Sequence, residues 1–462
     1  MRTQRMRVIN SINMTTAPHN HSLVARSLAA VWHPCTQMKH HEQFPLLPIA
    51  RGEGAWLIDY EGRRYLDAVS SWWVNLFGHV NPRINAALRA QLDTLEHAML
   101  AGFTHEPAIE LSERLGKLTG LGHAFYGSDG ASAVEIALKM SFHYWRNVGK
   151  PAKQKFVSLE GSYHGETLGA LAVSDVAIFR DAYGPLLNNN LRVPFPATPE
   201  PRADNAGEPC CPECVVDAIA ALQILLATRH HEIAAFIVEP LVQGAAGMRM
   251  YHPDYLSKAR ELCNQFGVHL IADEIMTGFG RTGTMFAFEQ AAIKPDFICL
   301  SKGLTGGYLP LSCVLSSDDI YAAFYDDNTA RGFLHSHSYT GSALACRAAL
   351  ATLDIFAADD VIASNRDKAA RFTTLAAALQ QHPQVKNFRH LGMIWAFEVK
   401  DGVEKATPQF AREFFARALS HGVLLRPIGN SVYFMPPYIT NDAEFAWLVA
   451  KTVATISEMT VK

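Results

Sequence analysis

The chain has 462 residues, of which 49% are hydrophobic and 18% charged, a composition typical of a globular protein larger than one compact domain. Its 41 basic and 44 acidic side chains give a formal net charge of −3, so no strong overall field favours nucleic acid or an anionic membrane. The sequence also lacks an apolar run long enough for a membrane-spanning helix. We therefore expect small-molecule partners, with no nucleic acid and no membrane.

The eight cysteines are scattered, and no secretory leader is recognisable, which predicts reduced thiols in a cytoplasmic protein. One cluster, "CCPEC" at 210–214, contains a C-x-x-C pair. Because no second pair follows at the spacing of a structural zinc site, we expect loop thiols and no metal. Residues 1–41 contain no acidic side chain, and we expect 1–30 to be a flexible N-terminal extension.

A small β meander followed by two helices is predicted in the first quarter of the chain. From about residue 51, short alternating segments broken by Gly and Asp indicate a small β meander. The pair Asn81-Pro82 then signals the start of a helix, and "HEPAIELSERLGKLTG" indicates a second helix that stops at Gly120.

Between about 120 and 345, short apolar runs alternate with helical segments: "KFVSLE", "IAAFIVEP", "GVHLIADE" and "DFICLSKG". Such runs predict parallel strands buried on both faces, with functional residues collected at the carboxyl edge of the sheet. The Pro-rich stretch ending at 214 is interpreted as a surface loop. A helix, strands and further helices after 350 suggest a second, α+β domain. We expect domain segments 31–85, 86–345 and 346–462, the large domain being the middle one.

Three glycines have the G-x-G-x-x-G spacing of a dinucleotide-binding fingerprint: Gly278, Gly280 and Gly283. In a dinucleotide fold the first glycine follows its strand directly, and a helix opens after the last. Here several residues separate Gly278 from the strand, and no helical pattern begins at Gly283. We interpret the glycines as a turn that carries Arg281 back over a cleft with Asp273 at its floor.

An acidic and a basic residue end two neighbouring predicted strands. Asp273 ends "VHLIAD", and Lys302 follows the next strand, "DFICL". Adjacent parallel strands would bring the two side chains together, where they could form a simple ion pair. The same pair suits pyridoxal phosphate, because a lysine forms a Schiff base with the aldehyde and a carboxylate keeps the pyridine nitrogen protonated.

The segment "FYGSDGASAVEIALKM" could bind the phosphate of that cofactor. Asp129 and Gly130 precede a helix, and free N–H groups and the helix dipole favour an anion at such a start. On its own the pattern is equally consistent with an ordinary capped helix. In "GSYHGET", Tyr163 and His164 follow a strand, and an aromatic ring there could stack on the pyridine ring.

Taken together, the chain resembles the class III, fold-type I pyridoxal-phosphate aminotransferases from about residue 31 onward. The resemblance is carried by "GSDGASAVEIALKM", "GSYHGETLGAL", "FIVEPLVQGAAGMRM", "LIADEIMTGFGRTG", "LSKGLTGG" and "HSHSYTGSALAC". It implies an α/β fold with a large domain, whose mostly parallel sheet is flanked by helices, and a smaller α+β domain from the N- and C-terminal segments. It also implies a homodimer with the active site at the subunit interface.

The family pattern then suggests a role for individual residues. Lys302 would form the Schiff base, Asp273 would bind the ring nitrogen, and Tyr163 would complete the catalytic set. Seven residues would contact the cofactor: Asp129, Gly130, Tyr163, Asp273, Lys302, His337 and Ser338. The last of these falls where the family usually has a Thr donated by the other subunit.

Within the class, four segments are similar to the biotin-pathway branch: "VWHPCTQM", "AVSSWWVNLFGH", "LVQGAAGMRMYHP" and "LLRPIGNSVYFMPPY". These enzymes move the amino group of S-adenosylmethionine to 8-amino-7-oxononanoate. The resemblance implies seven substrate-binding residues: Cys35, Trp72, Tyr163, Arg281, Lys302, Ser336 and Arg426. Arg426 would bind the acceptor carboxylate with its planar fork. Cys35 occupies a position where the family carries a Tyr, so the acceptor is better supported than the donor.

Several alternatives remain open on the sequence alone. Another class III aminotransferase could act on an ω-amino acid, ornithine or a diamine, or the same acceptor could take its amino group from lysine. An aminomutase of the same fold would need no separate donor. An NAD-dependent oxidoreductase is supported by the glycine spacing alone, and a non-catalytic relative would be expected to lack Lys302 or Asp273.

Overall fold

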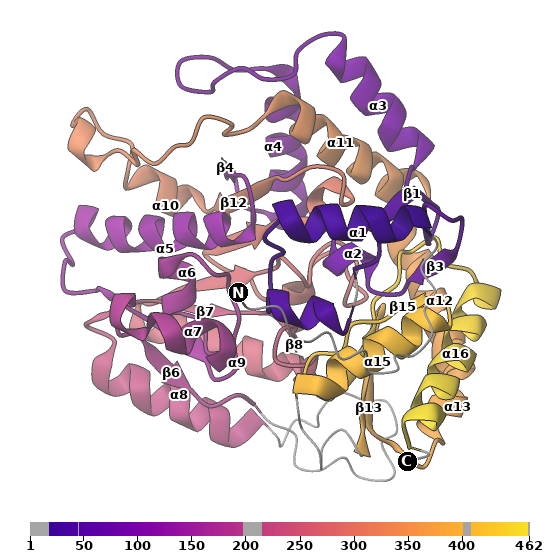
Figure 1. Cartoon of the computed structure of the whole chain (residues 1–462). Coiled ribbons are helices and arrows are strands. Elements are labelled where there is room, and N and C mark those ends of the chain that lie inside the picture. The colour runs from indigo at the N-terminus through magenta and orange to yellow at the C-terminus, as the bar shows by residue number, and fades with distance from the viewer. Residues whose placement is uncertain (1–17, 45, 197–214, 401–407, 461–462) are drawn as a thin grey trace, which may run out of the picture.

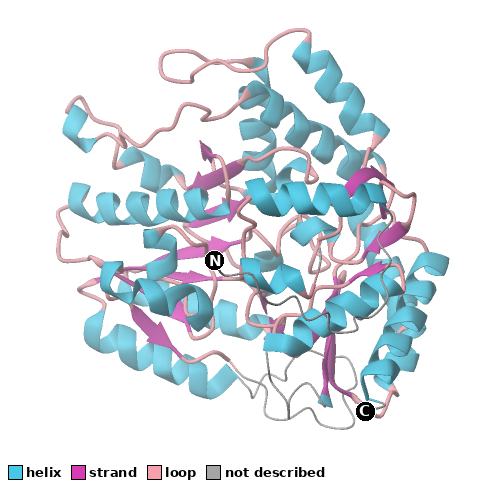
Figure 2. Cartoon of the chain, viewed as in Figure 1, coloured by secondary structure: helices cyan, strands magenta, loops and turns pink. Residues whose placement is uncertain are grey.

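A computed structural model describes residues 18–44, 46–196, 215–400 and 408–460. The cysteine cluster at 210–214 lies outside these ranges. A large central sheet is flanked by helices, and smaller sheets lie to one side, near the C-terminal helices (Figures 1 and 2). Within the ranges given above, no helix combines the length and apolar character needed to cross a bilayer.

The central sheet has seven strands in the order β4-β12-β11-β10-β7-β5-β6. Their bounds are β4 (His123–Gly127), β5 (Lys155–Leu159), β6 (Leu191–Val193), β7 (Ile233–Val238), β10 (His269–Asp273), β11 (Phe297–Leu300) and β12 (Ser312–Ser316). Only β12 is antiparallel to its neighbours, so the other six strands run in one direction. Every residue of β7, β10 and β11 is buried, which explains their continuous apolar runs and confirms the predicted mostly parallel sheet.

Helices pack on the sheet and beside it. Their bounds are α3 (Pro82–Leu92), α4 (Glu106–Thr119), α5 (Gly130–Asn147), α8 (Val216–Arg229), α9 (Pro253–Phe266) and α11 (Ala343–Ala358). The predicted helix signals are confirmed. The Asn81 side chain accepts the N–H groups of Arg83 and Ile84 at the start of α3, and Gly120 ends α4 with a φ of 70°.

Both ends of the chain build the smaller region. One sheet joins the predicted meander to a C-terminal strand: β1 (Ile49–Glu53), β2 (Trp56–Asp59), β3 (Arg64–Asp67) and β15 (Val423–Leu424). A second contains β13 (Val385–Leu391), β14 (Ile394–Val399) and β16 (Ser431–Phe434). The helices of this region are α12 (Val361–Leu375), α13 (Ala377–Gln380), α15 (Pro408–Ser420) and α16 (Asp442–Thr460). The domain boundaries expected after residues 85 and 345 fall inside helices α3 and α11. No break in the chain marks them, and they stay predictions.

Within the segment 1–30, predicted to be a flexible extension, residues 18–30 form helix α1 (Pro18–Ala30), and residues 1–17 lie outside the described ranges. The buried Asn20 holds the helix against the turn after β2, since its side-chain amide donates to Asp59 at 3.2 Å and its backbone N–H donates to Glu61 at 2.8 Å. The remaining short elements are η1 (Met38–Glu42), α2 (Ser70–Trp73), α6 (Leu168–Ala172), α7 (Ala177–Arg180), η2 (Asp181–Leu186), β8 (Val242–Gln243), β9 (Arg249–Met250), η4 (Ala287–Ala291), η5 (Lys302–Thr305), α10 (Asp318–Ala322) and η6 (Thr329–Arg331).

Candidate active site

Polar side chains gather where the parallel strands end. Because β4, β5, β7, β10 and β11 run in one direction, their carboxyl ends meet at one edge of the sheet. The residues at or just beyond those ends are Asp129, Tyr163, Glu239, Asp273 and Lys302. These side chains therefore lie at the carboxyl edge, where the strand pattern places them, and their functional roles stay predictions.

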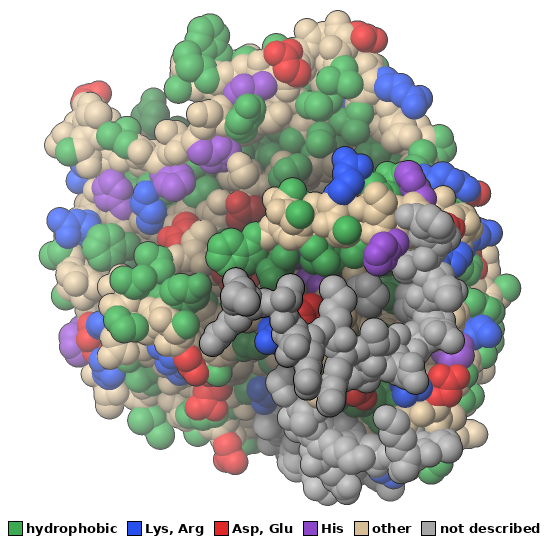
Figure 3. All heavy atoms as spheres, in the orientation of Figure 1, with side chains coloured by type: hydrophobic (Ala, Val, Ile, Leu, Met, Phe, Trp, Pro, Cys, Tyr) green, Lys and Arg blue, Asp and Glu red, His purple; other side chains and the backbone are tan. Residues whose placement is uncertain are grey.

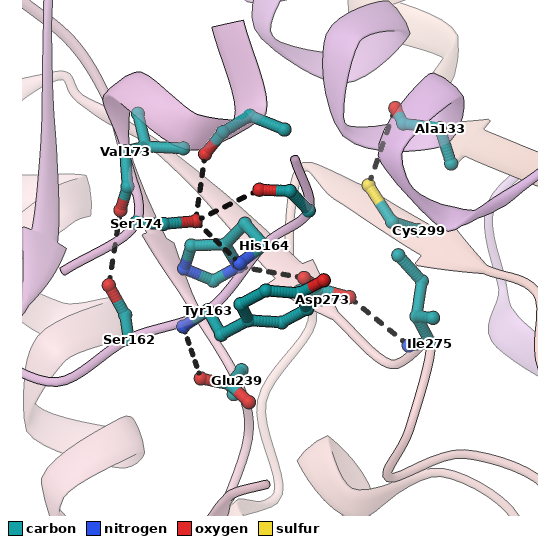
Figure 4. A network of polar contacts seen from close by, with 12 residues as sticks. Ala133, Ser162, Tyr163, His164, Val173, Ser174, Glu239, Asp273, Ile275 and Cys299 are labelled. Carbon is teal, nitrogen blue, oxygen red and sulfur yellow. Dashed lines mark hydrogen bonds and ion pairs between the residues drawn. The ribbon is translucent and has the colours of Figure 1, made fainter. Parts of the chain in front are cut away.

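Asp273 is held by His164 rather than by Lys302. Its Oδ2 lies 2.7 Å from Nδ1 of His164, and its Oδ1 accepts the N–H of Ile275 at 3.2 Å (Figure 4). The backbone N–H of His164 donates to the hydroxyl of Ser174 at 2.8 Å, which fixes the histidine in turn. Both side chains are buried, and the Nε2 of His164 has no partner within the described part of the chain. The carboxylate thus has a fixed orientation at the floor of the site.

The amine of Lys302 is available for chemistry. It lies 4.5 Å from the centre of the Trp73 ring, and among the described residues it forms no ion pair, so the simple Asp273–Lys302 pair does not form. Burial lowers the pKa of Lys302 to about 8, against the opposing influence of Asp273 and Glu239. About a tenth of this amine is therefore neutral, and so nucleophilic, at pH 7, far more than for an ordinary lysine.

Tyr163 is positioned by two carboxylates that the sequence did not single out. Its backbone N–H donates to Oε2 of Glu239 at 2.9 Å (Figure 4). Oε1 of Glu239 accepts the N–H of Gly244 at 3.0 Å. Burial raises the pKa of Glu239 to about 7. The hydroxyl of Tyr163 donates to Glu166 at 2.8 Å, and burial raises the pKa of the phenol, so it stays protonated. The loop after β5 is thus fixed at its backbone and its side chain.

The start of α5 fits an anionic group. The carboxylate of Asp129 accepts the N–H and the hydroxyl of Ser132, both at 2.9 Å. The first N–H groups of the helix, on Gly130 and Ala131, have no acceptor within the helix. A Cβ added at Gly130 would lie 2.9 Å from the Ile275 side chain, so this position is open only to glycine. A phosphate here, with a free lysine and a fixed carboxylate nearby, matches the parts of pyridoxal phosphate.

Three of the predicted substrate residues lie together at the surface. The guanidinium of Arg426 lies 4.6 Å from the centre of the Trp72 ring and donates to the carbonyl oxygen of Cys35 at 3.2 Å. Trp72 is 44% exposed, and Cys35 and Arg426 are also exposed. A long apolar molecule with a carboxylate at one end could therefore lie along the tryptophan with its charge at the arginine.

Arg281 differs from its predicted place over the cleft. It is 1% exposed, and its guanidinium donates to the carbonyl oxygens of Asn75 at 3.0 Å, Pro436 at 3.1 Å and Trp73 at 3.4 Å. The glycines around it form a turn, with positive φ at Gly280 and Gly283, and the next helical element starts only at residue 287. The loop lacks the strand-turn-helix geometry of a dinucleotide site.

The remaining candidates lie on the segment before α11. Ser336 and Ser338 are exposed, and the carbonyl oxygen of Ser338 is 2.7 Å from Nε2 of His97. Both ring nitrogens of His337 are 3.4 Å from the hydroxyl of Ser128, on the turn before α5. Among the described contacts, neither serine reaches Lys302 or Asp273.

Comparison with known proteins defines the class. The profile of the class-III aminotransferases matches residues 36–456, and the chain belongs to this family. It is 47% identical to the adenosylmethionine-8-amino-7-oxononanoate aminotransferase of Helicobacter pylori, over 95% of this chain and 98% of that protein. It is 38% identical to the Aquifex aeolicus protein of the same name, over 93% and 95%.

Solved structures agree with this assignment of the fold. The crystal structure of the Methanocaldococcus jannaschii adenosylmethionine-8-amino-7-oxononanoate aminotransferase matches with a TM-score of 0.88 at 35% identity, over 95% of this chain and 99% of that one. An amine transaminase from an uncultivated Pseudomonas species, solved in its pyridoxal-phosphate-bound form, matches with a TM-score of 0.85 at 31% identity, over 93% and 98%. The predicted fold-type I architecture is confirmed.

Proposed function

We propose that this protein transfers the amino group of S-adenosylmethionine to 8-amino-7-oxononanoate, giving 7,8-diaminononanoate in biotin biosynthesis, with pyridoxal phosphate as cofactor. The names of the relatives support both substrates. The observation that carries the acceptor is the contact between the Arg426 guanidinium and the Trp72 ring, next along the chain to Trp73, whose ring lies against Lys302. The reaction has two halves, in which the donor first leaves its amino group on the enzyme and the acceptor then collects it.

The residues at the sheet edge divide the work of binding the cofactor. Pyridoxal phosphate, when bound, supplies a ring that accepts the electrons left on a substrate carbon when it loses a proton. Asp273, oriented by His164, would hold the ring nitrogen in its protonated form. The start of α5 at Gly130 would bind the phosphate, and Tyr163 would cover the ring.

Lys302 would move the proton. Because burial lowers its pKa to about 8, the amine can take a proton from the substrate carbon and give it back near neutral pH. The Trp73 ring lies against this amine and excludes water from one side of it. Lys302 would therefore serve both as the attachment point of the cofactor and as the general acid and base.

The residues around Trp72 and Arg426 would bind the two substrates through different charges. The guanidinium of Arg426 would bind the acceptor carboxylate as a planar fork, and the Trp72 ring would cover its carbon chain. Glu166, exposed, bonded to the hydroxyl of Tyr163 and within electrostatic reach of Cys35, adds a negative group beside Arg426. A donor that carries positive charge on sulfur and nitrogen, as S-adenosylmethionine does, fits this charge.

A second copy of the chain would complete the site. Large apolar side chains are exposed on the loop between α3 and α4, where Figure 3 shows hydrophobic side chains at the top of the view, and on the segment before α11: Met99, Phe103, Leu334 and Tyr339. The two segments lie side by side, since His97 contacts Ser338 and packs 5.1 Å from the Tyr339 ring. We infer that this face pairs in a homodimer, with Ser338 donated to the phosphate site of the partner.

A two-step reaction of the purified, cofactor-loaded protein tests the proposal. S-adenosylmethionine alone should remove the yellow colour of the bound cofactor in a single turnover, and 8-amino-7-oxononanoate should restore it and yield the diamine. The Lys302→Ala variant is the control, and it should respond to neither. If lysine removes the colour and S-adenosylmethionine does not, the donor is wrong and the acceptor stands. If neither donor does so, the proposed function fails.

A further inference from the structure

Four consecutive residues next to the site have left-handed backbones. The φ angles of α2 are 51° at Ser70, 46° at Ser71, 72° at Trp72 and 73° at Trp73. None of these residues is glycine, so each Cβ approaches its own backbone closely. The N–H of Trp73 donates to the carbonyl oxygen of Val69 at 2.9 Å, which closes a single left-handed turn. Strain of this kind persists only where the surrounding structure holds it, and it concentrates at functional sites.

Asp67, the last residue of β3, holds this turn. One carboxylate oxygen accepts the N–H of Ser71 at 2.9 Å, and the other accepts the hydroxyl of Ser71 at 2.7 Å. The second oxygen also lies 3.1 Å from Nε2 of His79, and the carboxylate is fully buried. The hydroxyl of Ser70 donates to the carbonyl oxygen of Met435 at 2.7 Å, which ties the turn to the C-terminal region. Hydrogen bonds to a carboxylate are stronger than bonds to a neutral acceptor, so Asp67 holds the turn more firmly than a neutral side chain would.

The turn presents its two tryptophans to different groups. The Trp73 ring lies against the amine of Lys302, and its Nε1 donates to the hydroxyl of Tyr433 at 3.0 Å. The Trp72 ring lies against the guanidinium of Arg426 and is partly exposed. A right-handed backbone at this point would direct both rings elsewhere, because side-chain direction follows the backbone.

We propose that Asp67 is a positioning residue, which holds the left-handed turn and so sets both the position of the Trp72 ring, against which the acceptor would lie, and the packing of the Trp73 ring against the reactive lysine. Asp67 itself contacts Ser71 and His79, and acts only through the two tryptophans. The inference depends on the proposed function, because Trp72 and Arg426 matter to catalysis only if a carboxylate-bearing acceptor binds there.

Binding of nonanoate, a nine-carbon carboxylate without amine or ketone, tests this role apart from turnover. Calorimetry with the cofactor-loaded protein should show at least a tenfold weaker affinity for Asp67→Asn, which keeps the volume and removes the charge. Asp296→Asn is the matched control, since Asp296 also accepts a backbone N–H, that of Leu270, and an arginine, each at 2.7 Å, at the opposite edge of the sheet. That variant should bind nonanoate within twofold of the unmodified protein. Equal binding by the unmodified protein and Asp67→Asn would overturn the proposal.

A pair of substitutions at Ser71 tests the handedness of the turn. Ser71→Gly should keep nonanoate affinity within threefold, because glycine adopts a positive φ without steric cost. Ser71→Val should lose at least tenfold and unfold at a lower temperature, because a branched side chain is least compatible with this backbone. Equal behaviour of the two variants would overturn the proposal. If the unmodified protein does not bind nonanoate, the proposed acceptor site is wrong. The difference in unfolding temperature between the two variants then tests on its own whether the turn is left-handed.

Discussion

At the scale of single residues, the site depends on how burial changes the chemistry of Lys302. Taking an ammonium out of water disfavours its charged form, and this effect exceeds the opposing attraction of Asp273 and Glu239. The pKa of the amine therefore falls to about 8, so the neutral, reactive form appears as pH rises through that value. An ordinary lysine would reach the same state only near pH 10.4 or so.

The pH dependence of chemical modification measures this shift directly. In cofactor-free protein, the rate at which acetic anhydride modifies Lys302, followed by mass spectrometry of its peptide, should rise up to about pH 8 and level off above it. Exposed lysines of the same protein are the internal control, because their rates should keep rising toward pH 10. A Lys302 rate that parallels theirs would contradict the lowered pKa.

At the scale of elements, the loop after β10 that contains Arg281 connects parts of the fold that are distant in sequence. Arg281 donates to the carbonyl oxygens of Trp73 and Asn75 on one side and of Pro436 on the other. Arg281→Lys keeps the charge, but a single ammonium cannot reproduce a fork that donates in both directions. We expect the free energy of unfolding to fall by about 2 kcal/mol, seen as a lower urea midpoint.

A surface arginine provides the control for this prediction. Arg371 is about half exposed and pairs with Asp442, so Arg371→Lys should change the unfolding free energy by less than about 0.5 kcal/mol. The measurement also separates two roles for Arg281. If Arg281→Lys unfolds like the unmodified protein and only the KM for the acceptor rises, the residue binds substrate as the sequence suggested.

The sequence was most informative where an element is determined by its own residues. The apolar runs of β7, β10 and β11 predict buried parallel strands, and Asn81 and Gly120 mark helix ends by their local chemistry. The carboxyl-edge rule then brings Asp273 and Lys302 into one site.

Contacts between distant segments were not predictable in this way. His164 and Asp273 are 109 positions apart, and only the completed sheet brings the histidine to the carboxylate. Lys302 is left without an ion pair to any residue that the structure describes. The turn in "SSWW" contains no glycine or asparagine to announce a positive φ, because it is imposed by Asp67 and by Met435, which lies 365 positions from Ser70. Helix α1 was missed for the same reason, since its buried Asn20 is held by residues of the meander.

At the scale of the whole molecule, the exposed apolar face around Met99 and Tyr339 and the position of Ser338 together predict that each active site contains residues of two chains. If Ser338 serves the site of the partner, then Lys302 and Ser338 of a single chain belong to different active sites. A Lys302→Ala subunit still donates an intact Ser338, and a Ser338→Asp subunit, whose added charge repels a phosphate in the partner's site, still carries an intact Lys302. Each variant alone should have little activity, because every site of its homodimer has a defect.

Mixing the two variants under conditions that exchange subunits should restore activity. Each mixed dimer contains one site with both residues intact, so random pairing gives about a quarter of the activity of the unmodified protein. A mixture of Lys302→Ala with Asp273→Asn is the control, because both residues lie in the same chain's sheet edge and no intact site forms. Activity should appear in the first mixture and be absent from the second. Failure of the first mixture to gain activity, with mixed dimers demonstrated by native mass spectrometry, would show that Ser338 acts in its own subunit or not at all.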